Sequence, residues 1–194
     1  MNKELAVFLK ELENFGVAND QQMKDKSKRM RNVTPETGRF LSFIATTTQA
    51  RNILEIGTSN GYSTLWLAES VSENDGHVTT LEFLASKAEL AKSNFEKAKM
   101  SKWIDLIVMN ASEYIHKVES NTVDMIFLDS DRKEYVEWWG DLSRILKKNG
   151  LIVVDNVISH SNELQDFYIL VSNDENYKTI KLPIESGLLL LTKK

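Results

Sequence analysis

The chain has 194 residues, of which 42% are hydrophobic and 27% charged; this composition is typical of a globular domain and excludes a collagen, a coiled coil and a disordered chain. It contains no cysteine, which excludes a disulfide scaffold, a thiolate zinc site and a cysteine nucleophile. The net charge of −4 excludes a global basic field that would attract nucleic acid or a membrane surface.

The first 33 residues predict a helical segment in front of an α/β core over residues 34–194, within a single domain. Leu5, Phe8, Leu9 and Leu12 recur at the spacing of one helix face. The stretch 21–31 is polar and basic, which is typical of a loop or an exposed helix. Its cations indicate either a solvated face or a patch that contacts phosphate groups. These cations are Lys24, Lys26, Lys28, Arg29 and Arg31.

No membrane-spanning or targeting segment is expected. The apolar runs 151–154 and 188–191 are far shorter than the ~20 residues that span a bilayer. The N-terminal residues include an early acid, Glu4, and no apolar stretch, so they do not resemble a signal peptide. We therefore expect a cytoplasmic protein.

From residue 34 onward, short apolar runs alternate with longer amphipathic stretches. Thr34 and Pro35 predict the start of a helix, as its N-cap and its first residue. Asn149-Gly150 predicts the end of a helix that begins at Arg132. The further predicted helices are 62–70, 84–100, 111–117, 132–148 and 163–171. The predicted strands are 52–57, 77–82, 104–109, 123–128, 151–154, 177–182 and 188–192.

This alternation predicts βαβ units, and hence a mostly parallel sheet with helices on both faces. A short turn over 183–187 joins the last two strands without a helix, so we expect them to pair antiparallel at one edge. Ligands of such open sheets bind beyond the carboxyl ends of the strands. The polar residues that matter should therefore follow strands directly.

The first such place is the turn between the strand at 52–57 and the next helix. Gly57 and Gly61 allow the backbone to pass close to a ligand, and the helix N-terminus presents free amide groups. Ser59 stands where a dinucleotide fingerprint has its second glycine, and no lysine follows Gly61 as in a P-loop. The turn therefore favours a nucleoside ligand without a tightly held pyrophosphate, and the adjacent Glu55 and Ser63 strengthen this interpretation over that of an ordinary turn.

The second place is Glu82, at the end of the second predicted strand. It lies 25 residues after Gly57, close to the ~20-residue offset at which an acid meets ribose hydroxyls in nucleoside-binding α/β folds. Alone, a glutamate at the surface is a weak signal. Together with the glycine turn it predicts a ribose contact.

The third place comprises Asp129, after the fourth strand, and Asp155-Asn156, after the fifth. Neighbouring parallel strands would bring two carboxylates and one amide oxygen together, which is costly unless a cation joins them. Oxygen ligands select a hard divalent ion, with Mg²⁺ expected first and Ca²⁺ or Mn²⁺ as alternatives. The other interpretation is that each aspartate only caps the helix that follows.

Four motifs, in their order, resemble the class I S-adenosylmethionine-dependent methyltransferases. More narrowly, they are similar to the cation-dependent O-methyltransferases related to caffeoyl-CoA and catechol O-methyltransferases. The likeness covers roughly residues 30–194, including the closing LPIESGLLLLTKK. The motifs are NILEIGTSNGYSTLWLA, VTTLE, DMIFLDSDRKEY and GLIVVDN.

The resemblance implies a Rossmann-like methyltransferase fold of seven strands with the last one antiparallel. It also implies methyl transfer from S-adenosylmethionine to a hydroxyl of a small, catechol-like or phenolic acceptor, helped by a divalent cation. Asp129, Asp155 and Asn156 match the metal ligands. The implied cofactor contacts are Glu55, Gly57, Gly61 and Ser63 at the methionine end, Glu82 at the ribose, and Ala111 and Ser112 at the adenine side. Ser59 and Asp129 are further implied contacts, and Asn32 and Val33 lie in the segment that covers the cofactor.

One departure from the family concerns the acceptor's proton. Members with a DADK-like motif have a lysine base three residues after the first metal-ligand aspartate, where this chain has Arg132. Arginine stays protonated, with a pKa above ~12, and so could stabilise an oxyanion but not accept a proton. His160 is the alternative base by residue type, although it could equally be a surface histidine.

Tyr135, Trp138 and Trp139 could line a pocket for an aromatic acceptor, or they could form the buried stripe of a helix.

Two other functions stay open on the sequence alone. The basic run 24–31 is compatible with tRNA carrying a hydroxyuridine as the methyl acceptor, against which the net negative charge argues. Arg132 could instead mark a non-catalytic adenosyl-binding module. A homodimer through the N-terminal helix is a further expectation, unless Leu5, Phe8 and Leu12 pack on their own domain.

Overall fold

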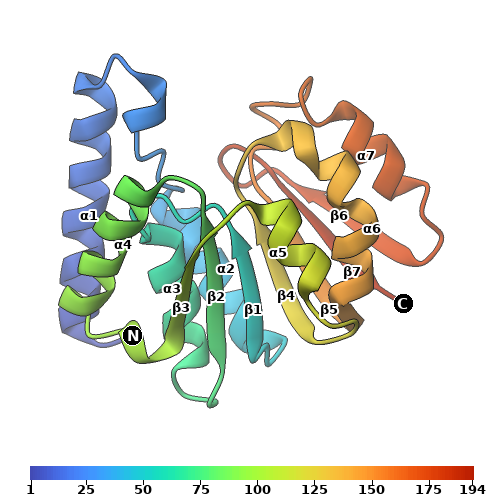
Figure 1. Ribbon diagram of the computed structural model, residues 1–194, viewed down its shortest axis with the longest axis horizontal. Helices are drawn as coiled ribbons and strands as arrows, with labels where there is room; N and C mark the ends of the chain where they lie inside the picture. The colour runs from blue at the N-terminus through green and yellow to red at the C-terminus, as the bar shows by residue number, and fades with distance from the viewer.

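Seven strands form one twisted sheet in the computed structural model, which describes residues 1–194 (Figure 1). The order across the sheet is β3-β2-β1-β4-β5-β7-β6. The neighbours among β1 to β5 run parallel, and β7 is antiparallel to both β5 and β6, as predicted. The strands are β1 (Asn52–Ile56), β2 (His77–Glu82), β3 (Ile104–Val108), β4 (Val123–Leu128), β5 (Leu146–Val154), β6 (Tyr177–Leu182) and β7 (Leu188–Lys193).

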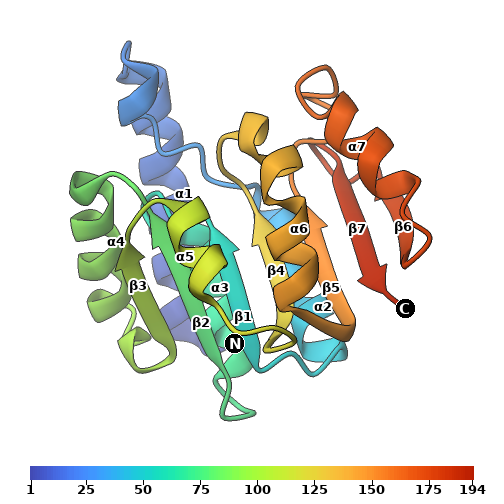
Figure 2. The same cartoon turned by 45° about the vertical axis from the view of Figure 1, so that its right-hand side comes forward.

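Helices cover both faces of the sheet, and each face has its own apolar core. The first four helices pack on one face, and the last three on the other, where Figure 2 shows α5 and α6 in front of the strands. Three short 3₁₀ turns, η1 (Lys26–Lys28), η2 (Ser101–Trp103) and η3 (Arg132–Glu134), join these elements. The helices are α1 (Lys3–Gln22), α2 (Pro35–Thr47), α3 (Tyr62–Val71), α4 (Ala85–Lys97), α5 (Ala111–Lys117), α6 (Tyr135–Ile145) and α7 (Gln165–Ser172).

The central strands are buried because helices cover both their faces. The last four residues of β4, Met125 to Leu128, have no exposed surface. Because both faces of this strand are covered, this part of its sequence is continuously apolar and does not alternate with polar residues.

The predicted start of α2 is confirmed. Thr34 is the N-cap and accepts from the Thr37 N–H at 3.2 Å, and Pro35 is the first helical residue.

The prediction of one helix over 132–148 is wrong at both ends. Residues 132–134 form η3, α6 ends at Ile145, and residues 146–150 belong to β5. Leu146 pairs with Val123 of β4, and the register then shifts before Leu151 pairs with Met125. Asn149 does adopt a left-handed backbone, with φ 61°, but it serves this irregular start of β5 instead of ending a helix.

The apolar face of α1 packs on its own domain. Leu5, Leu9 and Leu12 are buried in the core shared with α2 and α3. The pairing of two copies through this helix stays a prediction.

None of the helices has the length and apolar character needed to cross a membrane.

Candidate functional site

The carboxyl ends of β2, β1, β4 and β5 lie side by side at one edge of the sheet, the upper edge in Figure 1. The backbone ties these ends together in steps. The Gly57 N–H donates to Leu81 O, the Asp129 N–H to Ile56 O and the Asp155 N–H to Leu128 O, each at 3.1 Å. All three places that the sequence singles out therefore meet at this edge.

Two glycines permit the turn between β1 and α3. Gly57 has φ 107°, and a Cβ there would lie 2.2 Å from Asp129 O, closer than any side chain allows. Gly61 has φ 84° at the N-cap of α3, and a Cβ there would lie 2.3 Å from the Phe95 ring. The first of these close approaches joins the glycine turn directly to the backbone at Asp129.

Glu82 ends β2 and braces the same turn. The Ser59 N–H donates to its Oε2 at 2.8 Å, and the Leu84 N–H donates to its Oε1 at 2.9 Å. A carboxylate oxygen has capacity for a second bond, so the Glu82 carboxylate can still accept from two ligand hydroxyls. The predicted proximity of the glycine turn and Glu82 is thus found.

Glu55 has no exposed surface and lies beneath the turn. Its carboxyl group accepts from the hydroxyls of Ser63 and Thr80 at 2.6 Å, and from that of Thr64. Burial raises the pKa of Glu55 to about 7, while the three hydroxyl donors act in the opposite direction. Glu55 is therefore bonded to Ser63 and the start of α3 and has no surface of its own to offer a ligand.

Sequence reasoning missed Thr64 and Thr80. Thr80 is the direct partner of Glu55 in the parallel pairing of β1 with β2. Aligning the two predicted strands in register would have indicated it. Thr64 follows Ser63 in the first turn of α3. Its hydroxyl matters because it donates to the buried Glu55 carboxyl group, and the burial of Glu55 is not visible in the sequence.

Asp129, Asp155 and Asn156 do come together. Asn156 Nδ2 donates to Asp155 Oδ2 at 2.8 Å and lies 3.3 Å from Asp129 Oδ1. Burial and the neighbouring Asp155 carboxylate raise the pKa of Asp129, and burial raises the pKa of Asp155. Two buried carboxyl groups thus lie side by side, and the Asn156 amide bridges them.

The residues fit a hard divalent cation. Asp155 Oδ1 is buried without a hydrogen-bond partner in the protein, which is costly for a carboxylate oxygen and would be relieved by a cation. The Asn156 amide would have to turn over to present Oδ1, which accepts from Ser159 Oγ at 3.3 Å. Nowhere do three or more His, Asp or Glu side chains form a group able to hold a metal ion, so this candidate site depends on the Asn156 amide as third ligand.

Arg132 faces this cluster and is held by an acid from the loop before α7. Its Nε donates to Glu163 Oε2 at 2.9 Å, and its side chain is only 14% exposed. The positive charge lowers the pKa of Asp129 and of Asp155 and so offsets part of the effect of burial. Glu163 was not predicted to be a site residue, and no motif in the sequence indicates it.

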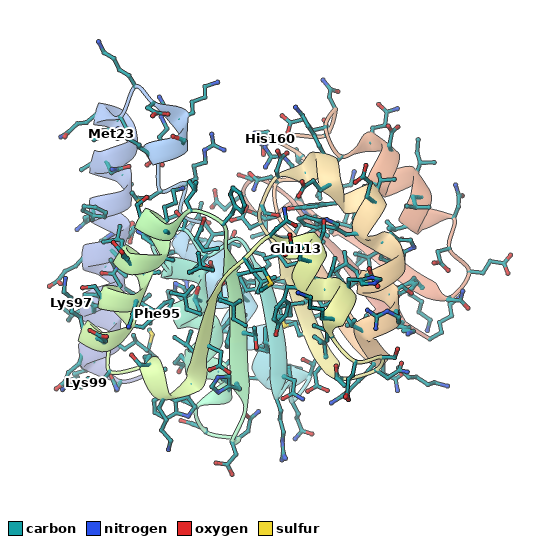
Figure 3. The ribbon with its side chains drawn as sticks, in the orientation of Figure 1. Met23, Phe95, Lys97, Lys99, Glu113 and His160 are labelled. Atoms are coloured by element: carbon teal, nitrogen blue, oxygen red, sulfur yellow. The ribbon has the colours of Figure 1, made fainter.

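His160 lies in the same loop, at the upper end of the molecule in Figure 3. Its backbone N–H donates to Asn156 O at 2.9 Å, and its Nδ1 lies 2.9 Å from Ser159 Oγ. The loop therefore joins His160 to the Asn156 turn. Met23, labelled in the same figure, lies on the opposite side of this end.

The segment that carries Val33 is fixed over the glycine turn. The Asp20 carboxylate accepts from the N–H groups of Met30 at 2.6 Å and Arg31 at 2.8 Å, and Ser59 Oγ donates to Met30 O at 2.6 Å. Val33 itself is buried. Asp20 was missed because its partners are ten and eleven residues away, outside any helix-cap pattern.

Ala111 and Ser112 begin α5, where Asn110 is the N-cap and accepts from the Ser112 N–H at 2.8 Å. Trp138 Nε1 donates to Ser112 Oγ at 2.8 Å. Trp138 is 3% exposed, as part of the core on the α5–α7 face. Tyr135 and Trp139 are buried in the same core, so the core interpretation of the aromatic stripe holds.

The comparison with protein families decides the relationship. A family model described as O-methyltransferase matches residues 2–194. The chain belongs to this O-methyltransferase family. The family predicted from the motifs is therefore confirmed, and the match includes the N-terminal helix in addition to the motif-bearing core.

Two curated relatives of this chain are catechol O-methyltransferases. The one from Mycobacterium tuberculosis is 35% identical over 129 residues, which is 65% of this chain and 57% of the relative. The one from Niastella koreensis is 34% identical over 137 residues, which is 69% of this chain and 62% of the relative. The matched segments thus span less than two thirds of these relatives.

Solved structures of O-methyltransferases share the fold. The O-methyltransferase from Bacillus cereus in complex with SAH is 27% identical, with a TM-score of 0.81 over 97% of this chain and 91% of that one. The putative caffeoyl-CoA O-methyltransferase from Staphylococcus aureus is 26% identical, with a TM-score of 0.84 over 96% and 92%. The predicted Rossmann-like methyltransferase fold is confirmed.

Proposed function

We propose that the protein transfers a methyl group from S-adenosylmethionine to a hydroxyl of a small, catechol-like or phenolic acceptor, with a divalent cation held by Asp129, Asp155 and Asn156. The observation that carries the proposal is the meeting of these three side chains beside the Gly57 turn. Family membership and the SAH bound by the Bacillus cereus relative support the choice of reaction and cofactor.

The strand tips offer a contact for each part of the cofactor. Bound S-adenosylmethionine supplies an electrophilic methyl group on a sulfonium. The Glu82 carboxylate would accept from the ribose hydroxyls, and the N-terminus of α3 would bind the methionine carboxylate through free amides. Ala111 and Ser112 would lie at the adenine side. Val33 would exclude water from the opposite side, because its segment is fixed over the turn.

The acceptor hydroxyl must lose a proton to become a good nucleophile, since a phenol has a pKa near ~10. A divalent cation, when bound, supplies positive charge that lowers the pKa of a hydroxyl next to it. Arg132 keeps its own proton and would stabilise negative charge on the acceptor oxygen. His160 is the candidate to receive the proton, because an imidazole can act as a general base and its loop is bonded to the Asn156 turn.

The test is methyl transfer to a catechol, followed by chromatography of the methylated product, with added Mg²⁺ and with EDTA. We expect turnover with Mg²⁺ and its loss with EDTA, restored by excess Mg²⁺. Turnover that EDTA leaves unchanged would contradict the cation. Binding of S-adenosylmethionine without transfer to any hydroxylated acceptor would favour the non-catalytic module.

A second candidate acceptor, tRNA, has one observation in its favour. Lys24, Lys26 and Lys28 are exposed and form no ion pair, and they lie in and around η1, which projects at the upper left in Figure 1, above α4. Adding tRNA to the same assay separates the two acceptors. Transfer to tRNA alone would replace the catechol-like acceptor in the proposal and keep the rest.

A further inference from the structure

The first turn of α6 reaches two separate parts of the proposed site. Tyr135, the first residue of α6, has no exposed surface, and its hydroxyl accepts from the Ser130 N–H at 2.8 Å. The same hydroxyl lies 3.4 Å from Ser130 O, as a weaker donor. Ser130 follows Asp129 directly, so this side chain holds the backbone of the turn that presents the Asp129 carboxylate.

Trp138 lies one helical turn further along the same face of α6. It donates from Nε1 to Ser112 Oγ at 2.8 Å, at the start of α5, and its ring packs on Tyr135 with 5.6 Å between centroids. Residues three apart on a helix are neighbours, which places the two rings side by side. One rigid helix face therefore touches both the Asp129 turn and the first turn of α5.

The far end of α5 is tied to α6 as well. The Arg144 guanidinium donates to Val118 O at 2.6 Å and to Ile115 O at 2.9 Å, which also accepts from the Val118 N–H at the C-cap. Because α5 has only seven residues, it cannot hold its position through its own stability. Its place relative to the strand tips is set by α6 at both ends.

We propose that Tyr135 and Trp138 are positioning residues. Together they fix the distance between the Asp129 carboxylate and the turn at Ser112, on the cofactor side. The inference rests on the proposed function, because it gives these two turns their ligands. Tyr135 would act on cation binding through the Ser130 amide. Trp138 would act on cofactor binding through the Ser112 hydroxyl.

The test uses Tyr135→Phe and Trp138→Phe, which remove one hydrogen bond each and keep an aromatic ring in the core. Matched controls exist in the same core. Tyr177→Phe removes the buried bond from the Tyr177 hydroxyl to Ser143 Oγ, at 2.9 Å, and Trp139→Phe removes the bond to Asp174 Oδ2, at 3.3 Å. Both control bonds lead away from the strand tips, so they report the cost of losing a buried bond without the positioning effect.

The readouts are Mg²⁺ and SAH affinities by calorimetry and thermal stability. Loss of a hydrogen bond that orients a metal ligand typically lowers metal affinity about 10-fold or more, and we expect that loss for Tyr135→Phe with little change in SAH affinity. Trp138→Phe should weaken SAH binding and leave Mg²⁺ affinity near that of the wild type. The controls should change only the melting temperature.

Two results would overturn the inference. The first is the same Mg²⁺ affinity in Tyr135→Phe and Tyr177→Phe. The second is a fall of the Mg²⁺ and SAH affinities together in Tyr135→Phe and in Trp138→Phe, in proportion to the fall in melting temperature. Wild-type protein that binds neither Mg²⁺ nor SAH contradicts the proposed function instead. In that case, hydrogen exchange of the Ser130 amide still tests the positioning role of Tyr135. Exchange should be faster in Tyr135→Phe than in Tyr177→Phe, and equal exchange in the two variants would contradict that role.

Discussion

Three carboxyl groups, of Glu55, Asp129 and Asp155, are enclosed at neighbouring strand tips, and each has a raised pKa. Their surroundings differ. Glu55 is surrounded by hydroxyl donors, whereas Asp155 keeps one oxygen without a partner. Glu55 is therefore held in its neutral form up to about pH 7, and this costs stability above its ordinary pKa, whereas the aspartate pair keeps an oxygen that a cation would satisfy.

Glu55→Gln should remove a pH dependence of stability. The folded state holds the Glu55 proton up to about pH 7, whereas an unfolded chain releases it near 4.5. Its contribution is therefore fully present below 4.5 and is lost as the pH rises through about 7. Chemical unfolding at pH 5 and pH 8 should show the wild type losing up to about 3 kcal/mol more than the variant. Equal losses in the two proteins would contradict the raised pKa.

Glu82→Ala should weaken SAH binding about 10-fold or more, because a charged acceptor for hydroxyl groups is lost. The alanine also removes the acceptor of the Ser59 and Leu84 N–H groups, so the fold needs its own check by circular dichroism. Glu82→Gln serves as the matched variant, since it keeps an acceptor oxygen without the charge. Calorimetry that gives unchanged affinity in both variants would refute the ribose contact.

Asp155→Asn should stabilise the protein in EDTA while abolishing its response to Mg²⁺. The variant removes one of two buried like charges, and the orphaned Oδ1 no longer belongs to an anion. We expect a higher melting temperature in EDTA than the wild type, no rise on adding Mg²⁺, and no cation-dependent turnover. A variant that keeps full activity in Mg²⁺ would show that the ligand assignment is wrong.

Among the elements, the segment 29–33 is tied to α1 chiefly by the Asp20 carboxylate, with further bonds from Ser59 to Met30 O and from Asn32 to Leu12 O. Asp20→Asn keeps one oxygen for the Met30 and Arg31 N–H groups but removes the charge that strengthens both bonds. We expect faster hydrogen exchange in residues 29–33 and weaker SAH binding, with α1 itself unchanged. Glu13→Gln on the same helix, whose partner is the exposed Lys10, is the control and should change neither.

Elements with strong local signals were predicted well. The bounds of α5, β4 and β6 agree with the prediction, because turn or capping residues flank them, and β4 in addition contains a continuous apolar run. The end of α6 was not predictable in this way. Leu146 continues the helical pattern, but its pairing with Val123 comes from a contact across the sheet, which no local signal contains.

At the scale of the whole molecule, topology explains why the meeting of these polar residues could be predicted from the sequence. Side chains after parallel strands must meet at one edge, so Glu82, Asp129 and Asp155 needed only the strand positions to be brought together. Residues that enter from elsewhere could not be found. Asp20 and Glu163 join the site from α1 and from a loop, and their partners are defined by packing alone.

The close approach of Gly57 to the Asp129 carbonyl has an evolutionary consequence. Because glycine has a hydrogen atom where other residues have a Cβ, the turn between β1 and α3 can pack directly against the backbone at Asp129. Any larger residue there would displace both at once, so the two halves cannot diversify independently. The loop over 157–164 meets a similar restraint at Ile158, which would lie 2.4 Å from a Cβ on Gly187, whereas Ser159 and Ser161 are exposed. We therefore expect descendants of this chain to vary at the exposed positions of the loop before they vary at Gly57.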